Sequence, residues 1–304
     1  MPMITRKRWF LVARKGSMVT GHERPVSRHT LRNLPWVPML IMGAVVFLAI
    51  FAPWVVPHDP EAQSLPDRRM PPFWVESGSF RHVLGTDSLG RDILSRMFYG
   101  ARITALVAAG ALMLGGGIGL TLGILAGYLG GKVDALVMRA VDATMSFPTI
   151  LFALVMAVAL GPGLLTIIVA LVVIVWASYA RIMRADVLSV RHRDHVIAAT
   201  AIGCSHFRIM VVHILPMVLN TFLVVLSLNA GQLILTEATL SFLGAGVPPD
   251  TPTWGAMVAD GRRYVATAWW ISVVPGIAIT LVVLALNLFG DWLRDRLDPR
   301  LRGR

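Results

Sequence analysis

The side chains that most often carry catalysis or hold metals are few and scattered in this chain. Its single cysteine, Cys204, excludes an intrachain disulfide and a cysteine-based zinc cluster. The eight histidines stand at no zinc-binding spacing with cysteine or carboxylate residues, and the sequence contains no Ser/His/Asp, Cys/His or paired-carboxylate arrangement. We therefore expect no catalytic residue and no metal ligand, and the chain is predicted not to be an enzyme.

The glycine-rich stretch in the middle of the chain does not fit a nucleotide site. Gly131-Lys132 is followed by Val133 where a phosphate-binding loop has Ser or Thr, and no G-x-G-x-x-G register fits. The chain is expected to bind no cofactor of its own.

A row of small residues, four apart, is the clearest packing signal. Every fourth residue of a helix falls near one face, so the row predicts a ridge on which a second helix packs closely. A ligand path along the ridge is the other interpretation. The row consists of Ala111, Gly115, Gly119, Gly123, Gly127 and Gly131.

Two acidic residues stand at the edges of long apolar stretches. Glu237 is the best candidate for an intramembrane polar role, either in structural pairing or in a substrate path or gate. Asp142 lies three residues after Arg139, a helical spacing that predicts an ion pair. A carrier driven by protons or sodium usually needs more buried charge than this.

The segment 181–215 is the most unusual connection. Apolar residues recur at helical spacing before and after Gly203, and the pattern ends at Pro216. It predicts two short amphipathic helices joined at the glycine. Docking of a partner and simple filling of space are both open interpretations.

These residues must be positioned by a membrane fold. Hydrophobic residues make up 56% of the 304-residue chain, charged residues 15%, and the mean hydropathy is +0.68. A spanning helix needs about 20 apolar residues. The charge-free stretch 143–180 is long enough for two spans and folds back at Gly161-Pro162-Gly163. The sequence predicts an all-α membrane protein with six transmembrane helices, at 36–57, 103–129, 141–160, 164–181, 216–240 and 267–290.

The basic residues set the orientation. With both termini inside, 20 of the 28 Lys and Arg residues fall in inside segments and eight in outside segments. The positive-inside rule therefore predicts N-in/C-in. Topology and contact with lipid headgroups also account for the net charge of +11, so no nucleic-acid partner is expected.

We therefore expect five parts along the chain. They are a cytoplasmic N-terminal tail (1–35), the first transmembrane helix (36–57), an outside loop with a short helix (58–102), a five-helix core containing the cytoplasmic loop 181–215 (103–290) and a cytoplasmic C-terminal tail (291–304).

The segment around Gly203 resembles a known element. The run His195-Val-Ile-Ala-Ala-Thr-Ala-Ile-Gly203, nine further residues, and His213-Ile-Leu-Pro216 are similar to the EAA loop of binding-protein-dependent ABC importer permeases. Ile197 occupies the position of the glutamate, which leaves Ala198, Ala199 and Gly203 as the matching core.

Other segments narrow the resemblance to the dipeptide/oligopeptide/nickel permease family, over about residues 36–300. The chain is most similar to the C-type subunit, which has a long first outside loop. The matching segments are Leu84-Gly-Thr-Asp-Ser-Leu-Gly-Arg-Asp92, Met138-Arg-Ala-Val-Asp142, Ser146-Phe-Pro148, Glu237-Ala-Thr-Leu-Ser-Phe-Leu-Gly244, Pro248-Pro249, Trp254-Gly255 and Gly290-Asp-Trp-Leu-Arg-Asp-Arg-Leu-Asp-Pro-Arg300.

The resemblance implies a type I ABC importer permease (MetI-like) architecture in the bacterial inner membrane. The implied partners are a second homologous permease, two cytoplasmic ATPases that bind ATP and Mg, and a periplasmic or lipid-anchored substrate-binding protein. In the family the EAA loop forms a coupling helix that sits in a groove of an ATPase. The residues that the resemblance assigns to this coupling loop are Ala198, Ala199, Gly203, Cys204, Ser205, Phe207, Arg208, His213 and Pro216.

The function implied is that of a permease subunit forming half of the pathway for di- or oligopeptides. The same class of transporter carrying nickel or another small solute is the first alternative. An ion-coupled secondary carrier is the second, and the scarcity of buried charge argues against it.

The first prediction tests the orientation. In a Cys204→Ser background, Gln63→Cys should react with an impermeant thiol reagent on intact cells, whereas Ser17→Cys should react only after lysis. Labelling of Ser17→Cys alone on intact cells would reverse the assigned topology.

Overall fold

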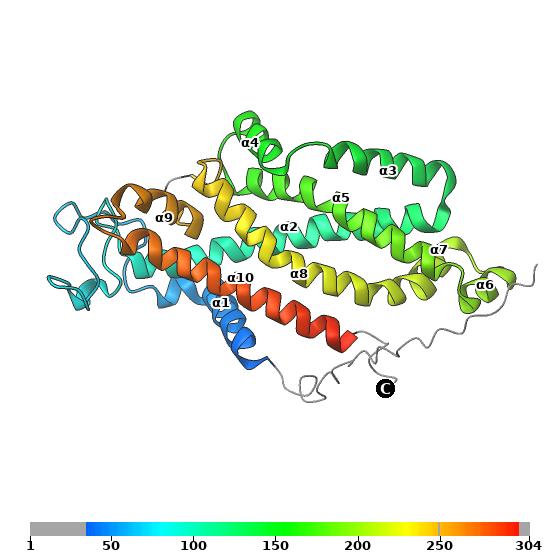
Figure 1. The fold of residues 1–304 in the computed structure, drawn as a ribbon, viewed down its shortest axis with the longest axis horizontal. Helices are drawn as coiled ribbons and strands as arrows, with labels where there is room; N and C mark the ends of the chain where they lie inside the picture. The colour runs from blue at the N-terminus through cyan, green and yellow to red at the C-terminus, as the bar shows by residue number, and fades with distance from the viewer. Residues whose placement is uncertain (1–34, 249, 298–304) are drawn as a thin grey trace, which may run out of the picture. The chain divides into compact units, whose positions relative to one another are not determined.

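The computed structural model describes residues 35–248 and 250–297 (Figure 1). Over these residues the regular elements are helices, apart from one isolated bridge between Thr86 and Asp92. In chain order they are α1 (Trp36–Val55), η1 (Phe80–His82), α2 (Ile93–Leu129), α3 (Gly131–Met145), α4 (Thr149–Leu160), α5 (Leu164–Val190), α6 (Asp194–Ala201), α7 (His206–Arg208), the π-helix η2 (Ile209–Ile214), α8 (Leu215–Phe242), α9 (Trp254–Gly261), η3 (Arg262–Tyr264) and α10 (Trp270–Leu297).

The helices confirm the predicted all-α membrane fold. In the described part, five helices are long and apolar enough to cross a membrane: α1, α2, α5, the continuous helix from His206 to Phe242, and α10. The bent pair α3 and α4 makes a sixth span when the two are counted together.

The predicted tails, 1–35 and 291–304, fall largely outside the described residues. Where the second one is described it is helical, because α10 continues to Leu297. The helix therefore extends seven residues beyond the predicted last span, 267–290, and these added residues include four charged side chains. Two arginines in the last turn of α10 suit the negative end of the helix dipole, which favours this extension.

α2 begins ten residues before the predicted span 103–129. The prediction of a separate short helix within 58–102 is wrong, because that helix and the span are continuous over 37 residues, about 55 Å. The cap is Asp92, whose carboxylate accepts a hydrogen bond from the N–H of Ser95 at 2.8 Å. A helix this long exceeds the roughly 30 Å apolar layer, so one end of α2 projects beyond the membrane.

The predicted third span, 141–160, is wrong as a single helix. α3 and α4 meet at 86° across the break between Met145 and Thr149. Pro148 lies in this break, and a proline disfavours the helical conformation of the residue before it. α3 is held to α5 by two ion pairs, Asp134 with Arg184 and Asp142 with Arg181. Asp142 therefore pairs with α5 and not with Arg139, the partner that the spacing predicted.

The segment 181–215 is more continuous with the bundle than predicted. Its first residues extend α5 to Val190 instead of the predicted end at 181, and only α6 is a separate short helix. The second apolar run joins α8 and does not stop at Pro216. The N–H of Leu215 donates to the carbonyl of Met210, five residues earlier, and this π turn places Pro216 in the first turn of α8, where its missing N–H is tolerated.

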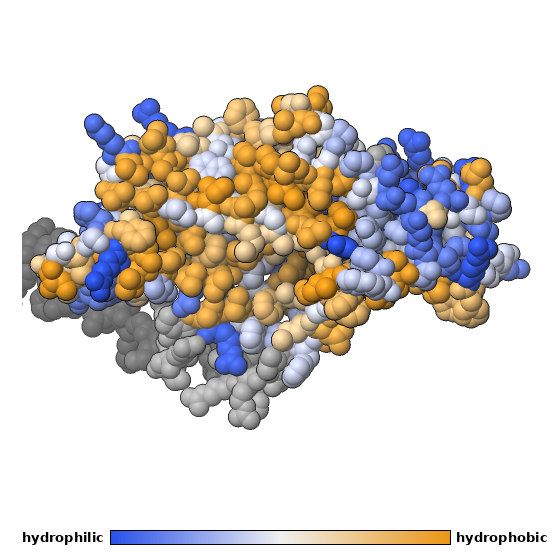
Figure 2. Space-filling model, turned by 180° about the vertical axis from the view of Figure 1, so that it is seen from behind, coloured by the Kyte–Doolittle hydropathy of each residue, from blue (hydrophilic) through white to orange (hydrophobic). Residues whose placement is uncertain are grey.

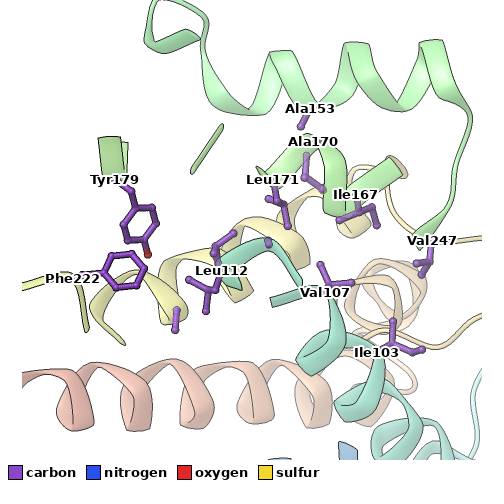
Figure 3. Close-up of a cluster of buried hydrophobic side chains, with 14 of the residues drawn as sticks. Ile103, Val107, Leu112, Ala153, Ile167, Ala170, Leu171, Tyr179, Phe222 and Val247 are labelled. Carbon is purple, nitrogen blue, oxygen red and sulfur yellow. The ribbon is translucent and has the colours of Figure 1, made fainter. Parts of the chain in front are cut away.

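The largest buried cluster lies where α2, α5 and α8 meet (Figure 3). Tyr179 on α5 packs edge-on against Phe222 on α8, with ring centroids 5.8 Å apart. Leu112 of α2 and Leu171 of α5 belong to the same cluster. In lipid such contacts stabilise helix association through close packing, since the surroundings are equally apolar.

The row of small residues brings α2 and α5 together. A Cβ built on Gly119 would lie 2.5 Å from Tyr179 Cβ and 2.6 Å from the carbonyl oxygen of Trp176. Cβ atoms on Gly123 and Gly127 would lie 2.7 and 2.8 Å from the Cβ atoms of the α5 residues they face. The ridge therefore packs against the backbone of α5.

The two ends of the row differ from its middle. Ala111 is fully buried, and a Cβ on Gly115 would meet the carbonyl oxygen of Val172 at 3.3 Å. Gly131 does not belong to the ridge, because it starts α3 with a φ of +54° and a Cβ there would meet nothing within 4 Å. The assignment of Gly131 to the packing face is corrected: the helix ends two residues before it.

The surface of the bundle separates into an apolar middle and polar ends. In Figure 2 apolar residues cover the middle of the helices, and polar residues gather at the end that carries the 58–92 loop and α9. Figure 1 places this loop and the α6–α7 segment at opposite ends of the long helices. The two connections therefore lie beyond opposite faces of the apolar layer.

The second prediction concerns the ridge. Gly119→Ala should destabilise the protein by roughly 1–3 kcal/mol, because its Cβ overlaps the α5 backbone. Gly117→Ala is the matched control: it lies on the same helix, has nothing within 4 Å, and should change stability by no more than about 1 kcal/mol in the favourable direction. Thermal unfolding of the purified protein in detergent measures both, and equal midpoints would show that α2 and α5 are not in contact.

Candidate functional site

The turn between α6 and α7 is a defined helix ending. The N–H of Cys204 donates to the carbonyl of Ala199 at 3.1 Å, and the N–H of Gly203 donates to the carbonyl of Thr200 at 3.0 Å. This pair of bonds with a left-handed residue is the Schellman motif. Gly203 has a φ of +81°, and a Cβ there would meet nothing within 4 Å. The glycine is therefore required for the backbone conformation and not for space within this chain.

The predicted coupling residues divide into exposed and inward-facing ones. Ala198, Gly203, Ser205, Phe207, Arg208 and Pro216 are exposed, while Cys204 and His213 are half-buried. Ala199 is buried and packs inside the chain with Val196, so it cannot provide close approach to a partner. This corrects the prediction for Ala199: consecutive residues of a helix point about 100° apart, so α6 exposes Ala198 and turns Ala199 inward.

Large apolar side chains project from this surface. Ile202 is 80% exposed and Phe207 is 73% exposed, and they flank Gly203 on either side. Ile197, at the position where the EAA pattern has glutamate, is also exposed. The exposed basic residues Arg193 and Arg208 lie on the same short segment. We call Ile202 and Phe207 the apolar knob, and Arg193 and Arg208 its basic rim. A surface of this kind is typically covered by a partner protein.

This surface is fixed to the bundle. The inner faces of α6 and η2 pack in one cluster with Ile124 of α2, Val187 of α5 and Val218 of α8. Tyr128 at the end of α2 hydrogen-bonds through its hydroxyl with Nδ1 of His206, at 2.9 Å. Arg191 donates to the carbonyl of Gly127 at 3.1 Å. A force applied at α6 and α7 therefore reaches three long helices.

Behind the same surface lies a cavity of about 650 Å³ between α5, α8 and α10. Pro216 lines it, as do Asp186, Arg193 and Arg294. Pro216 therefore contributes to this cavity wall and to the start of α8, in addition to its place in the loop pattern.

A groove lined by both apolar and polar side chains lies deeper in the apolar layer, between α4, α5 and α8. It has a volume of about 180 Å³. Uncharged hydrogen-bonding side chains line it from two helices, together with Thr149 at the start of α4. They are Ser178 and Tyr179 on α5, and Asn229, Gln232 and Thr236 on α8.

Sequence reasoning missed this groove, although a signal was present. Asn229, Gln232 and Thr236 are spaced three and four residues apart, which places them on one face of α8. Polar side chains inside a span are costly unless they line a path or pair with one another. Their facing partners on α5, however, could be found only from the packing.

Glu237 lies beside the groove but does not line it. Its side chain is 1% exposed, and its Oε1 accepts a hydrogen bond from Ser241 Oγ at 2.8 Å. Its Oε2 has no hydrogen-bond partner among the described residues. The arrangement gives the carboxyl a structural pairing within α8, and a role as a gate stays a prediction.

At the opposite end an ionic network holds the start of α2. Arg91 Nε donates to Asp87 Oδ2 at 2.6 Å, and Arg91 Nη2 lies 3.5 Å from Asp260 Oδ2 on α9. The buried Arg96 lies near the same Asp87 carboxylate, at 3.7 Å, and donates to the carbonyl of Pro60 at 3.3 Å. Burial raises the pKa of Asp260, and the neighbouring Arg91 opposes that shift.

The indole N–H groups of two tryptophans add to this network. Trp254 on α9 donates to the carbonyl of Met97, and Trp270 on α10 donates to the carbonyl of Thr86. The Gly-Thr-Asp and Gly-Arg-Asp residues of the 84–92 segment therefore hold the start of α2 against α9 and α10.

Residues 119–303 match the family described as the binding-protein-dependent transport system inner membrane component. Residues 33–72 match the N-terminal TM domain of oligopeptide transport permease C.

Two curated relatives extend along most of the chain. The di/tripeptide transport system permease protein of Pseudomonas aeruginosa is 42% identical over 264 residues, which are 87% of each chain. The dipeptide transport system permease protein of Escherichia coli is 43% identical over 266 residues, 88% of this chain and 89% of the relative. Both resemblances are well above the level at which a shared family is secure.

A solved structure has a similar fold. The crystal structure of an amino acid ABC transporter with histidines aligns with a TM-score of 0.52 at 16% identity, over 67% of this chain and 94% of that one. At this identity the likeness concerns the fold alone.

Proposed function

Because the chain belongs to the family of binding-protein-dependent transport system inner membrane components, we propose that it carries peptides across the membrane, as half of a pathway formed with a second permease. It is a multi-pass permease subunit of a bacterial inner-membrane ABC importer, and not itself an enzyme. Such a subunit works with ATPase and substrate-binding partners.

The ATPases are proposed to dock on α6 and α7. The observation that supports this site is the exposure of Ile202 and Phe207, the two side chains of the apolar knob. Exposed side chains of this size at a polar end of the bundle need a partner to cover them. A partner groove with apolar walls and acidic edges would complement the knob and its arginines. The cluster behind the knob then passes the ATPase motion to α2, α5 and α8.

The groove between α5 and α8 supports peptides as the substrate class. Its amide and hydroxyl groups offer both donors and acceptors, which suit the N–H and C=O groups of a peptide backbone. Nickel prefers imidazole, carboxylate or thiolate ligands, and the residues that line this groove include none of these. Because uncharged groups that bind the peptide backbone do not select by charge, the groove would accept peptides with different side chains.

The substrate-binding protein is proposed to meet the 58–92 loop. Phe73, Trp74 and Phe80 form an aromatic group there, with Phe73 stacked on Phe80 at 4.9 Å and Phe80 79% exposed. Exposed aromatic side chains at a polar surface are typical of contact sites for other proteins.

The third prediction tests the docking surface. Gly203→Asp places a charge beside the apolar knob and should greatly reduce the amount of ATPase retained on the purified permease pair. Gly244→Asp is the control: it has a φ of +83° and open space around it, so it carries the same backbone strain of roughly 1–2 kcal/mol at a different site. Phe207→Ala should weaken retention about tenfold, as expected for a central apolar contact. Normal retention by both Gly203→Asp and Phe207→Ala would place the ATPase contact elsewhere.

The fourth prediction tests the groove and the substrate class. Asn229→Leu and Gln232→Leu should each raise the KM for labelled di- or tripeptide uptake roughly 2- to 10-fold, the effect of one lost hydrogen bond, with ATPase retention unchanged. Thr280→Val is the control, because its hydroxyl is exposed on α10 and bonds only the carbonyl of Gly276 in its own helix. Uptake of radioactive nickel in place of peptides by the intact transporter would favour the alternative substrate.

A further inference from the structure

Three side chains with metal-binding atoms meet at the outer end of α2, although they are distant in sequence. His58 follows α1, His82 ends η1 and Asp92 caps α2. The three possible ligand atoms lie within 4.8 Å of one another. No histidine stands at a zinc-binding spacing to a carboxylate in the sequence, yet the fold places His82 Nδ1 2.9 Å from Asp92 Oδ1. The spacing of 24 and 10 residues gives no sign of this in the sequence.

The distances suit a small divalent ion. Donors that each lie about 2.1 Å from a tetrahedral zinc ion are about 3.4 Å apart. The separations here bracket that value: 2.9 Å from His82 Nδ1 to Asp92 Oδ1, and 3.8 Å from His58 Nδ1 to Asp92 Oδ2. All three possible ligand atoms lie within 4.8 Å of one another, so rotations of the side chains would bring them to an ion between them.

Neighbouring residues orient the Asp92 carboxylate, whereas His58 Nδ1 has no hydrogen-bond partner among the described residues. Asp92 Oδ2 accepts from the N–H and the hydroxyl of Ser95, at 2.8 and 2.7 Å, which orients the carboxylate as a supporting shell would. His58 Nδ1 is buried and has no hydrogen-bond partner among the described residues. A buried nitrogen without a partner, aimed at a carboxylate, calls for a bound group.

We propose that His58 Nδ1, His82 Nδ1 and the Asp92 carboxylate bind a divalent transition metal of the zinc type. Two imidazoles and one carboxylate are a common zinc ligand set, with water as the usual fourth ligand, and the 34% exposed side chain of His58 places the site near the protein surface. When it coordinates through Nδ1, His82 would be the neutral tautomer with its proton on Nε2, and a proton displaced from between His82 and Asp92 would pass to water. The bound ion would cross-link the chain after α1 to the start of α2 and so stabilise the 58–92 loop.

The fifth prediction measures this directly on the permease pair with its ATPases, purified without a histidine tag and stripped with a chelator. The wild-type complex should bind one more equivalent of Zn²⁺ than the His58→Gln complex, in competition with a chromophoric chelator. Loss of a supporting partner typically costs about 10- to 100-fold in metal affinity, and loss of the ligand His58 should cost at least the upper value. Co²⁺ should give visible d–d bands in the wild-type complex that His58→Gln lacks.

The variants are chosen so that a loss of zinc binding can be distinguished from a loss of folding. His58→Gln preserves the backbone N–H that donates to Ser95 Oγ at 3.1 Å, whereas replacing His82 removes a buried hydrogen bond. His195→Gln, at the exposed surface of α6, is the control and should bind as much Zn²⁺ as the wild type. Zinc should also slow proteolysis of the 58–92 loop in the wild type only. Equal zinc binding by the wild-type and His58→Gln complexes would mean that the histidines only hydrogen-bond near Asp92, and would overturn the proposal.

Discussion

The approach of α2 to α5, backbone against backbone, is the constraint on which the rest of the structure depends. Gly119, Gly123 and Gly127 leave no room for a Cβ, because α5 backbone and Cβ atoms occupy that space. Side chains at these positions would push the helices apart and open the cluster that Tyr179 and Phe222 fill. In lipid no hydrophobic force returns the helices to contact, so the packing itself must be close.

The α2–α5 pair also connects the two ends of the protein. α2 starts in the ionic network of Asp87, Arg91 and Arg96, where the 58–92 loop folds over it. α5 ends beside α6, and Tyr128 at the other end of α2 bonds His206 next to α7. A pair packed this closely resists sliding of one helix past the other, so we expect a displacement at the knob to reach the outer network. This is a physical basis for coupling between an ATPase and an outer loop in the proposed transporter.

The broken span has a consequence for the bundle. Because α3 turns away from α4 at Pro148, it lies along α5 and is held there by its ion pairs with Arg181 and Arg184. α4 is then free to cover the polar side chains of α5 and α8, and Thr149 at its start lines the groove. A straight third span would separate these two roles.

The amino-acid sequence by itself determines the solvent, five of the membrane spans and the helix-packing face. The charge-free stretches must cross an apolar layer, and glycine every fourth residue can serve only one face of a helix. The short-range pattern around Gly203 likewise predicts a helix ending at that glycine, because the left-handed conformation suits no other residue as well. These features depend on neighbours within a few positions, so the linear order carries them.

The tertiary structure alone decides which distant residues meet. It joins His58 and His82 to Asp92, sets Asn229 of α8 across from Tyr179 of α5, and turns Ala199 inward while Ala198 stays exposed. It also carries helix α7 through Pro216 into α8 by a π turn, where the local rule for proline predicts an end. The reason is physical: helix ends and cross-chain contacts follow from the balance of packing across several helices, and single-segment periodicity does not contain that balance.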